Sequence, residues 1–306
     1  MKKCLFILFT LGLPLYSAAC DICGCGVGSG YIGILPDFSK HIAGLRYRAN
    51  KMTTHLGADG ATTYLTTQEH YNTLEAWGGW TIGNNVRLMV AAPYSFNRKT
   101  NQGNTEAKNG LGDISATAFY QLVNKRKSMP GARQFVQSLW AGAGVKLPTG
   151  QYNSAQTNIN SNNANLFQLG SGSYDFNLTS MYDLRLQDFG INLTGNYRVT
   201  TTNRYGYKYG NKLNVNTQLY YKRRLASKFS IAPNAGLQFE SSSTDRNNGF
   251  DMSGSGGYLC MGTLGAEFVL RSISFGTNYQ IPLQQKLARE IIKAGNRTMV
   301  HVGYIF

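Results

Sequence analysis

Apolar and polar residues alternate with a period of two through most of residues 41–306, in segments separated by breaks rich in Gly, Asn, Asp and Ser. In residues 212–222, for example, leucine, valine, threonine and tyrosine occupy every second position, with asparagine, glutamine and lysine between them. A period of two is typical of a β-strand whose two faces differ. About twelve such segments follow one another, so we expect an all-β chain with an even number of strands.

The breaks between the segments alternate in length. Those after even-numbered segments are short, at residues 83–85, 124–130, 187–188, 225–227 and 271–272. Those after odd-numbered segments are mostly longer and polar, at residues 97–111, 148–170, 241–257 and 282–296. Short turns at one rim and long loops at the other are typical of an outer-membrane β-barrel, whereas a soluble sandwich has no reason to alternate in this way.

The polar face of the segments is too polar for a dry core. Asn192, Asn196, Asn214, Asn216 and Gln218 share the inward phase, and burying unpaired amides away from water is costly. A water-filled lumen removes that cost, and the apolar face must then meet lipid. We therefore predict a transmembrane antiparallel up-and-down β-barrel of about twelve strands.

Composition agrees with a barrel. Only 15% of the residues are charged, well below the usual quarter, as expected when one face of every strand must be uncharged. The formal net charge is +15, which raises the question of nucleic-acid binding. The basic residues are scattered singly except for Lys125, Arg126 and Lys127, which fall in a predicted turn. We therefore expect no nucleic-acid partner.

The amino-terminal residues predict export. Residues 1–19 combine a basic start, an apolar core and small residues before Cys20, which is the pattern of a signal peptide. Acylation of Cys20 is an alternative to simple cleavage, although Ser17 stands where such signals usually carry leucine. Residues 20–40 form a segment rich in Cys and Gly, which we expect to be a periplasmic tail or a plug in the lumen, ahead of the barrel at residues 41–306.

Three thiols lie within six residues of this segment: Cys20, Cys23 and Cys25. Soft thiolates at such spacing can hold Cu(I), Zn or an iron–sulfur centre. A local disulfide, with the third cysteine free or lipidated, is the competing interpretation. A zinc site wants four ligands, and the nearest histidine, His41, is 16 residues beyond Cys25.

The last ten residues read as a closing strand. Val300, Val302, Tyr304 and Phe306 alternate with a mixed set. An aromatic carboxy-terminal residue resembles the assembly signal of bacterial outer-membrane barrels, so we expect Phe306 to engage the barrel-assembly machinery. Outer-membrane lipid and lipopolysaccharide are then the surroundings, and the bacterial outer membrane is the expected location.

Charged residues in the inward phase are the candidate solute-lining positions: Arg46, Arg48, Arg87, Asp113, Lys146, Asp183, Arg198, Lys212 and Lys222. They are mixed and mildly basic, which predicts a weak preference for anions. We expect no catalytic residues, because the four histidines have no accompanying serine motif and the carboxylates look like partners in ion pairs. Cys260 falls in the lipid-facing phase, and we expect it to stay free.

Four short motifs occur along the barrel, at residues 110–114 (GLGDI), 145–150 (VKLPTG), 172–175 (GSYD) and 279–283 (YQIPL). Together they resemble the outer-membrane transporter family associated with the meta-pathway of phenol degradation. The cysteine cluster resembles a feature of a subgroup. The resemblance implies a channel for small solutes, hydrophobic or aromatic ones among them. The alternative is a non-conducting barrel whose cysteine cluster binds a soft metal or a periplasmic partner.

Overall fold

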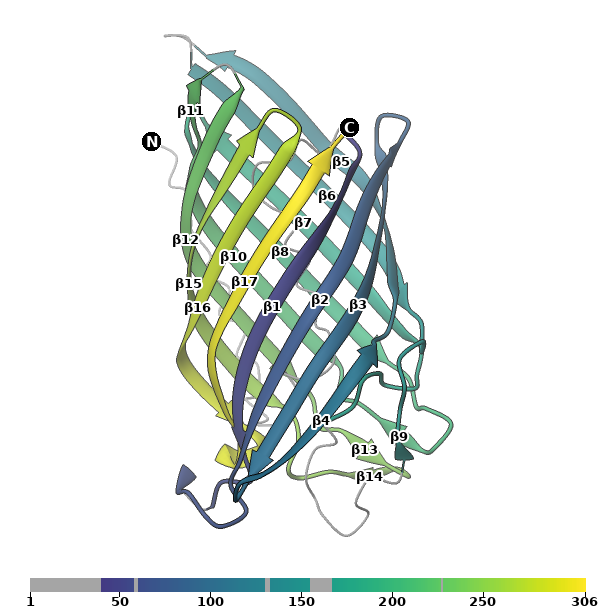
Figure 1. The fold of residues 1–306 in the computed structure, drawn as a ribbon. Helices are drawn as coiled ribbons and strands as arrows, with labels where there is room; N and C mark the ends of the chain where they lie inside the picture. Colours follow the sequence, from purple (N-terminus) through teal and green to yellow (C-terminus); the bar gives the residue numbers. More distant parts are fainter. Residues whose placement is uncertain (1–39, 58–59, 130–132, 155–166, 227) are drawn as a thin grey trace, which may run out of the picture.

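The computed structural model describes residues 40–57, 60–129, 133–154, 167–226 and 228–306. Within these residues twelve strands form one closed antiparallel barrel (Figure 1), as the alternation predicts. The strands are β1 (Ile42–Thr54), β2 (Thr67–Ile82), β3 (Val86–Asn101), β5 (Ser115–Met129), β6 (Arg133–Lys146), β7 (Asp175–Leu186), β8 (Phe189–Thr200), β10 (Lys212–Tyr221), β12 (Phe229–Ser242), β15 (Gly257–Leu270), β16 (Ile273–Leu287) and β17 (Lys293–Ile305).

Each barrel strand pairs with its neighbours in the chain, and β1 pairs with β17 to close the ring. The register at the closure runs from Ile42 opposite Ile305 to Thr53 opposite Lys293. Closure pairs each barrel strand on both sides over most of its length, which satisfies most of the backbone N–H and C=O groups of the wall. The expected antiparallel up-and-down barrel is confirmed.

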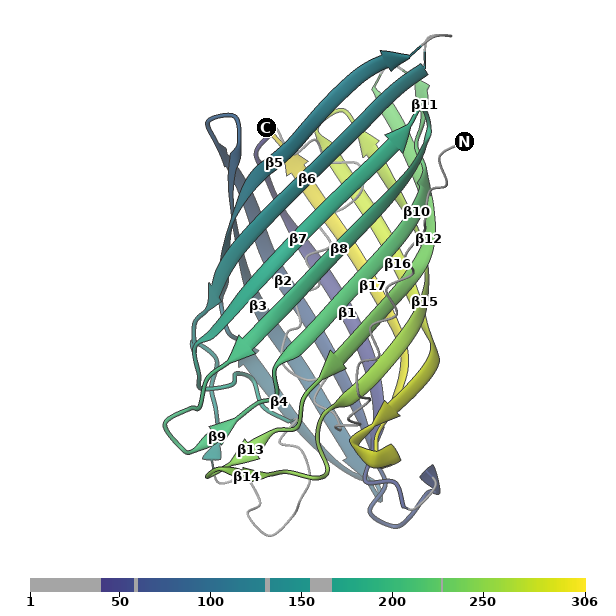
Figure 2. The same ribbon diagram turned by 180° about the vertical axis from the view of Figure 1, so that it is seen from behind.

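Several short strands and one helical turn extend or connect the twelve barrel strands. β4 (Asn104–Leu111) extends the hairpin of β3, and β11 (Arg223–Ala226) continues the line of β10 along β12. At the end that carries the longer loops, β9 (Tyr207–Lys208), β13 (Arg246–Asn247) and β14 (Phe250–Asp251) make a small second sheet, which Figure 2 shows beneath the barrel wall. One turn of 3-10 helix, η3 (Ala288–Glu290), joins β16 to β17.

Several predicted turns and loops lie within strands. The expected turn at residues 124–130 is wrong, because β5 runs to Met129 and places Lys125, Arg126 and Lys127 in a strand that is exposed to solvent. The expected loops at 97–111 and 282–296 are shorter, because β3 with β4 and β16 with β17 continue through most of them. Much of the turn expected at 225–227 also lies in a strand, because β11 runs to Ala226. Antiparallel pairing satisfies the backbone whether or not the side chains alternate.

The outward face is apolar, as expected. Along β8 the outward positions include Phe189, Leu193 and Tyr197, all exposed, while Thr194 and Arg198 point inward and are buried. Aromatic residues near the strand ends with aliphatic residues between them are typical of a barrel that spans a bilayer. In the residues that the structure describes, no helix has the length and apolar character needed to cross a membrane.

The closing strand and Cys260 follow the predicted phase. Val302, Tyr304 and Phe306 are exposed on the outside, whereas His301 and Ile305 are buried inside. Cys260 is a free cysteine between Leu259 and Met261, which are fully buried in the interior.

Candidate functional site in the barrel interior

Two arginines share one carboxylate at mid-height in the barrel. Glu75 on β2 lies 3.2 Å from Arg46 and 2.9 Å from Arg48, both on β1. Register explains the cluster, because Arg46 stands directly opposite Glu75 and period-two alternation places Arg48 on the same inner face. Two cations against one carboxylate leave excess positive charge on this wall.

Lys146 at the end of β6 is the centre of a second charged cluster. Its Nζ lies 2.7 Å from Asp113 and 2.9 Å from Asp175, and all three side chains are buried. Here two carboxylates face one cation, so this cluster carries excess negative charge. A buried ion needs partners of this kind, because losing one would leave an uncompensated charge.

Asp113 also joins two loops. Its carboxylate accepts backbone N–H bonds from Gly150 (2.9 Å) and Ser171 (2.9 Å). Thr149 adds two bonds, accepting from the Ile114 N–H and donating to the Gly112 carbonyl, both at 2.9 Å. The GLGDI and LPTG motifs are therefore the two halves of one clasp, which holds the connection before β5 against the connection after β6.

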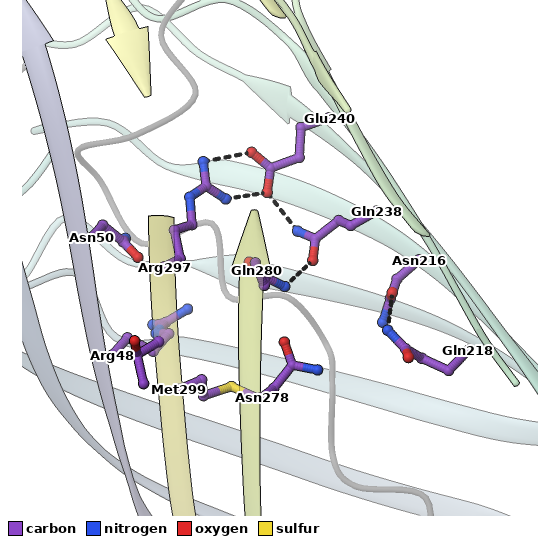
Figure 3. Close-up of a pocket in the computed structure, with 11 residues that line it drawn as sticks. Arg48, Asn50, Asn216, Gln218, Gln238, Glu240, Asn278, Gln280, Arg297 and Met299 are labelled. Atoms are coloured by element: carbon purple, nitrogen blue, oxygen red, sulfur yellow. Dashed lines mark hydrogen bonds and ion pairs between the residues drawn. The ribbon is translucent and has the colours of Figure 1, made fainter. Parts of the chain in front are cut away.

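The opposite wall is lined by amides. Figure 3 shows Arg297 making two bonds to Glu240, of 2.7 and 3.1 Å, with Gln238 and Gln280 continuing the chain of bonds. Gln218 donates to Asn216 at 2.9 Å in the same view. These residues line a cavity of about 50 Å³, which is large enough for ordered water.

Some side-chain oxygens of this amide wall have no hydrogen-bond donor in the described part of the protein. The side-chain oxygens of Gln218, Asn234 and Asn278 are buried and accept no hydrogen bond from the described part of the chain. Buried polar atoms normally have partners. Water or a polar solute in the lumen would supply them, which agrees with the prediction of a wet interior.

A third part of the interior is apolar. Trp77, Phe119, Trp140 and Met181 on β2, β5, β6 and β7 pack together inside the barrel near the short-turn end. The expectation of an amide-rich lumen did not include this wall. The signal was in the sequence, because these residues share the odd or even numbering of predicted inward charges nearby: Trp77 with Glu75, Phe119 with Asp113, Trp140 with Lys146 and Met181 with Asp183.

A separate apolar cluster lies inside the long-loop end. Met52, Tyr71, Leu259 and Leu287 pack there with Phe167, which comes from the connection between β6 and β7. The Phe167 ring stands edge-on to Tyr71 at 6.4 Å between centroids. The ammonium of Lys99 lies 4.8 Å from the centre of the same ring, a distance at which the cation and the ring attract.

The remaining predicted lining residues are spread along the interior. Arg87 is fully buried and donates to the Lys40 carbonyl at 3.1 Å, near the start of β1. Arg198 and Lys212 are buried on neighbouring strands and stand opposite each other. The Tyr220 hydroxyl donates its one hydrogen to the Asp183 carboxylate, whose two oxygens lie 3.0 and 2.9 Å away. Lys222 lies between the end of β10 and the start of β11.

The interior residues thus form local groups rather than one ring of charge. Arg46, Lys146 and Arg198 with Asp113 line a single cavity, whereas Arg48 lines the amide cavity. Whether any of them contacts a solute stays a prediction.

The predicted metal ligands Cys20, Cys23 and Cys25, like the predicted leader at 1–19, lie outside the described residues. In the described part of the chain, no group of three or more His, Cys, Asp or Glu side chains is placed to hold a metal ion.

The barrel is similar to known membrane proteins. The profile of the family described as "Putative MetA-pathway of phenol degradation" matches residues 46–259. No curated protein matches the sequence. Among solved structures, an outer membrane channel from Pseudomonas putida F1 is 15% identical over 92% of this chain and 100% of its own, with a TM-score of 0.63. The beta domain of the Bordetella autotransporter BrkA is 11% identical over 87% of this chain and 100% of its own, with a TM-score of 0.50.

Proposed function

Because the chain belongs to the family described as "Putative MetA-pathway of phenol degradation", we propose that it is a passive channel of the bacterial outer membrane for small solutes, hydrophobic or aromatic ones among them. One observation carries the proposal: a closed barrel has apolar side chains outside and charged, amide-bearing side chains inside. A soluble protein has the opposite arrangement. A barrel with this polarity can cross a bilayer and keep a wet interior.

The fold suggests how the barrel is oriented. Short turns face the periplasm and long loops face the exterior in barrels of this kind. The turns at residues 83–85, 187–188 and 271–272 would then lie in the periplasm, and the clasp of Asp113 would lie near the outer surface. The outward face would meet outer-membrane lipid and lipopolysaccharide.

The same proposal assigns the rest of the chain. Residues 1–19 act as a signal peptide, residues 20–40 form a tail or plug, and residues 41–306 are the barrel. Phe306 contacts the barrel-assembly machinery during insertion. We propose no catalytic role, since no nucleophile with an adjacent base was found in the sequence.

Measuring the conductance of the barrel and its ion selectivity tests the proposal, which predicts a weak preference for anions. The Arg46–Arg48–Glu75 group has excess positive charge, and Arg198 and Lys212 add to it, whereas the Lys146 group is negative. Among these groups the positive ones outweigh the negative one slightly, while other buried carboxylates such as Glu69 and Glu267 oppose them, so the charges of the interior favour anions only weakly. In planar bilayers under a KCl gradient, the reversal potential should be displaced weakly toward the chloride potential. A clear cation preference, or no conductance at all, would contradict this.

The second candidate is a non-conducting barrel in which residues 20–30 block the lumen and Cys20, Cys23 and Cys25 bind a soft metal or a periplasmic partner. The observation in its favour is three thiols within six residues. Deleting residues 20–30 separates the two candidates in one experiment. Increased conductance would identify a plug, and unchanged conductance with lost Cu(I) or Zn binding would identify a capture site. If neither changed, the second candidate would be rejected.

A further inference from the structure

A hollow with two chemical sides lies in the wall of the barrel. It has a volume of about 100 Å³ and is partly open. Its lining comes from β1, β2, β3, β5, β6, β7 and β8, and includes Trp77, Phe119, Ala91, Ser115, Lys146 and Arg198. We call it the aromatic hollow.

Strand register explains why the wall is indented there. Trp77, Ala91, Ser115 and Lys146 stand in one row across four neighbouring strands. The next row carries Met89, Thr117 and Gly144. The centre of the first row therefore has small side chains, while its two ends carry an indole and an ammonium. Small residues between large ones leave space that the packing cannot fill.

One side of the hollow is aromatic and apolar. Trp77 and Phe119 are both buried inside the barrel, and Met89 and Pro93 lie beside them in the lining. An indole and a phenyl ring present flat faces that favour the face or edge of another ring.

The other side of the hollow is polar and carries net positive charge. Three cations (Arg46, Lys146, Arg198) and two carboxylates (Glu75, Asp113) belong to the lining, so the balance is one positive charge. The Arg46 guanidinium carbon lies 5.3 Å from the centre of the Trp77 ring. A planar ring that packs against Trp77 would therefore lie near this cation.

Trp77 supplies an unpartnered donor at the same place. It is 5% exposed, and its indole N–H donates to no acceptor in the described part of the chain. Buried indole N–H groups usually have a partner. An acceptor oxygen on a ligand that occupies the hollow would complete this bond.

We propose that the aromatic hollow binds a single-ring aromatic carboxylate, with the ring against Trp77 and Phe119 and the carboxylate toward Arg46 and Arg198. A closed cavity of roughly 150 Å³ takes one benzene ring, and this hollow of about 100 Å³ is partly open, so a single ring would fill it and extend through its open side. The site rests on the proposed function, because the solute reaches it through the lumen.

Benzoate binding to the purified full-length barrel in detergent, measured by isothermal titration calorimetry, tests the site. Cyclohexanecarboxylate keeps the charge but lacks the aromatic ring, and acetate keeps only the carboxylate. Benzoate should bind roughly two- to tenfold more tightly than cyclohexanecarboxylate, since an aromatic pair adds about 0.5–1.5 kcal/mol beyond its area. Equal affinity for benzoate and acetate would overturn the proposal.

Two tryptophans on one strand provide a matched pair of variants. Trp77→Leu removes the inward ring and should weaken benzoate binding roughly two- to tenfold, as expected for one lost aromatic contact. Trp80→Leu removes an outward ring that is 42% exposed and should leave the affinity unchanged. Affinity equal to the native value in Trp77→Leu would reject the site.

A second variant covers the case in which Trp77→Leu does not fold. Ala91→Phe keeps every ring and fills the centre of the hollow, so it should abolish benzoate binding; retained binding would reject the site. Folding of each variant is checked by its heat-modifiable migration in SDS gels. Conductance is measured separately, so a barrel that conducts without binding benzoate rejects only the site. A barrel that binds benzoate without conducting rejects only the channel.

Discussion

At the scale of single residues, the period of two predicts which face of the barrel a side chain lies on but not which residues it pairs with. Parity places Arg46, Lys146 and Arg198 on the inner face, and the structure agrees. The pairing of those charges could not be predicted, because it depends on register between strands and on loops that return to the barrel. Lys146 meets Asp113 across a chain separation of 33 residues, which no local pattern specifies.

Asp113 leads to a prediction about stability. Asp113→Asn removes one of the two carboxylates around Lys146 and weakens the bonds from the Gly150 and Ser171 N–H groups. Lys146 keeps Asp175, so we expect a loss of about 2 kcal/mol, below the usual cost of breaking a buried pair completely. The midpoint of thermal unfolding, followed by heat-modifiable migration in SDS gels, should fall.

The control for Asp113→Asn is an exposed ion pair in the same protein. Arg246 and Asp251 lie 2.8 Å apart with their side chains 59% and 64% exposed. Exposed pairs contribute little, so Asp251→Asn should leave the unfolding midpoint unchanged. Equal midpoints for the two variants would show that the clasp around Asp113 does not stabilise the barrel.

At the level of elements, the sequence predicts the presence of each strand more accurately than the residues at which the strand begins and ends. The predicted turn at 187–188 is correct, because β7 ends at Leu186 and β8 begins at Phe189. The hairpin of β5 and β6 continues well past the predicted turn, because pairing needs only backbone groups once the strands leave the bilayer. Alternation therefore marks the part of a strand that lies in lipid, and says little about the rest.

The clasp between the β3–β5 and β6–β7 connections depends on two glycines in close contact. A Cβ on Gly170 would lie 2.5 Å from the Asp113 carboxylate and 2.6 Å from the Gly150 carbonyl. Backbone cannot move aside at low cost, so Gly170→Ala should lower the unfolding midpoint and increase cleavage of the β6–β7 connection in limited proteolysis.

Gly262→Ala on β15 is the matched control, because its Cβ would meet only the Leu283 side chain at 3.4–3.6 Å. That separation is an ordinary contact, so the substitution should be tolerated. If Gly170→Ala were as stable and as resistant to protease as Gly262→Ala, the close contact would not be needed for the clasp.

At the scale of the whole molecule, the closed ring determines what the interior can be. Twelve strands enclose a space narrow enough for side chains to fill much of it. The interior therefore divides into an amide wall, an apolar wall with the aromatic hollow, and charged groups between them. The sequence predicts the ring and its polarity, but this division appears only when strands far apart in the chain face one another.

The central claim is that the leucine-bearing face of the strands meets lipid and the amide-bearing face meets the lumen. Spin labels placed one at a time at residues 213–219 of β10, after the native cysteines are replaced by serine, report it most directly. In proteoliposomes, collision with oxygen, which concentrates in lipid, should peak at 213, 215, 217 and 219 and fall at the amide-bearing positions between them. Peaks at 214, 216 and 218 instead, or no period of two, would contradict the account.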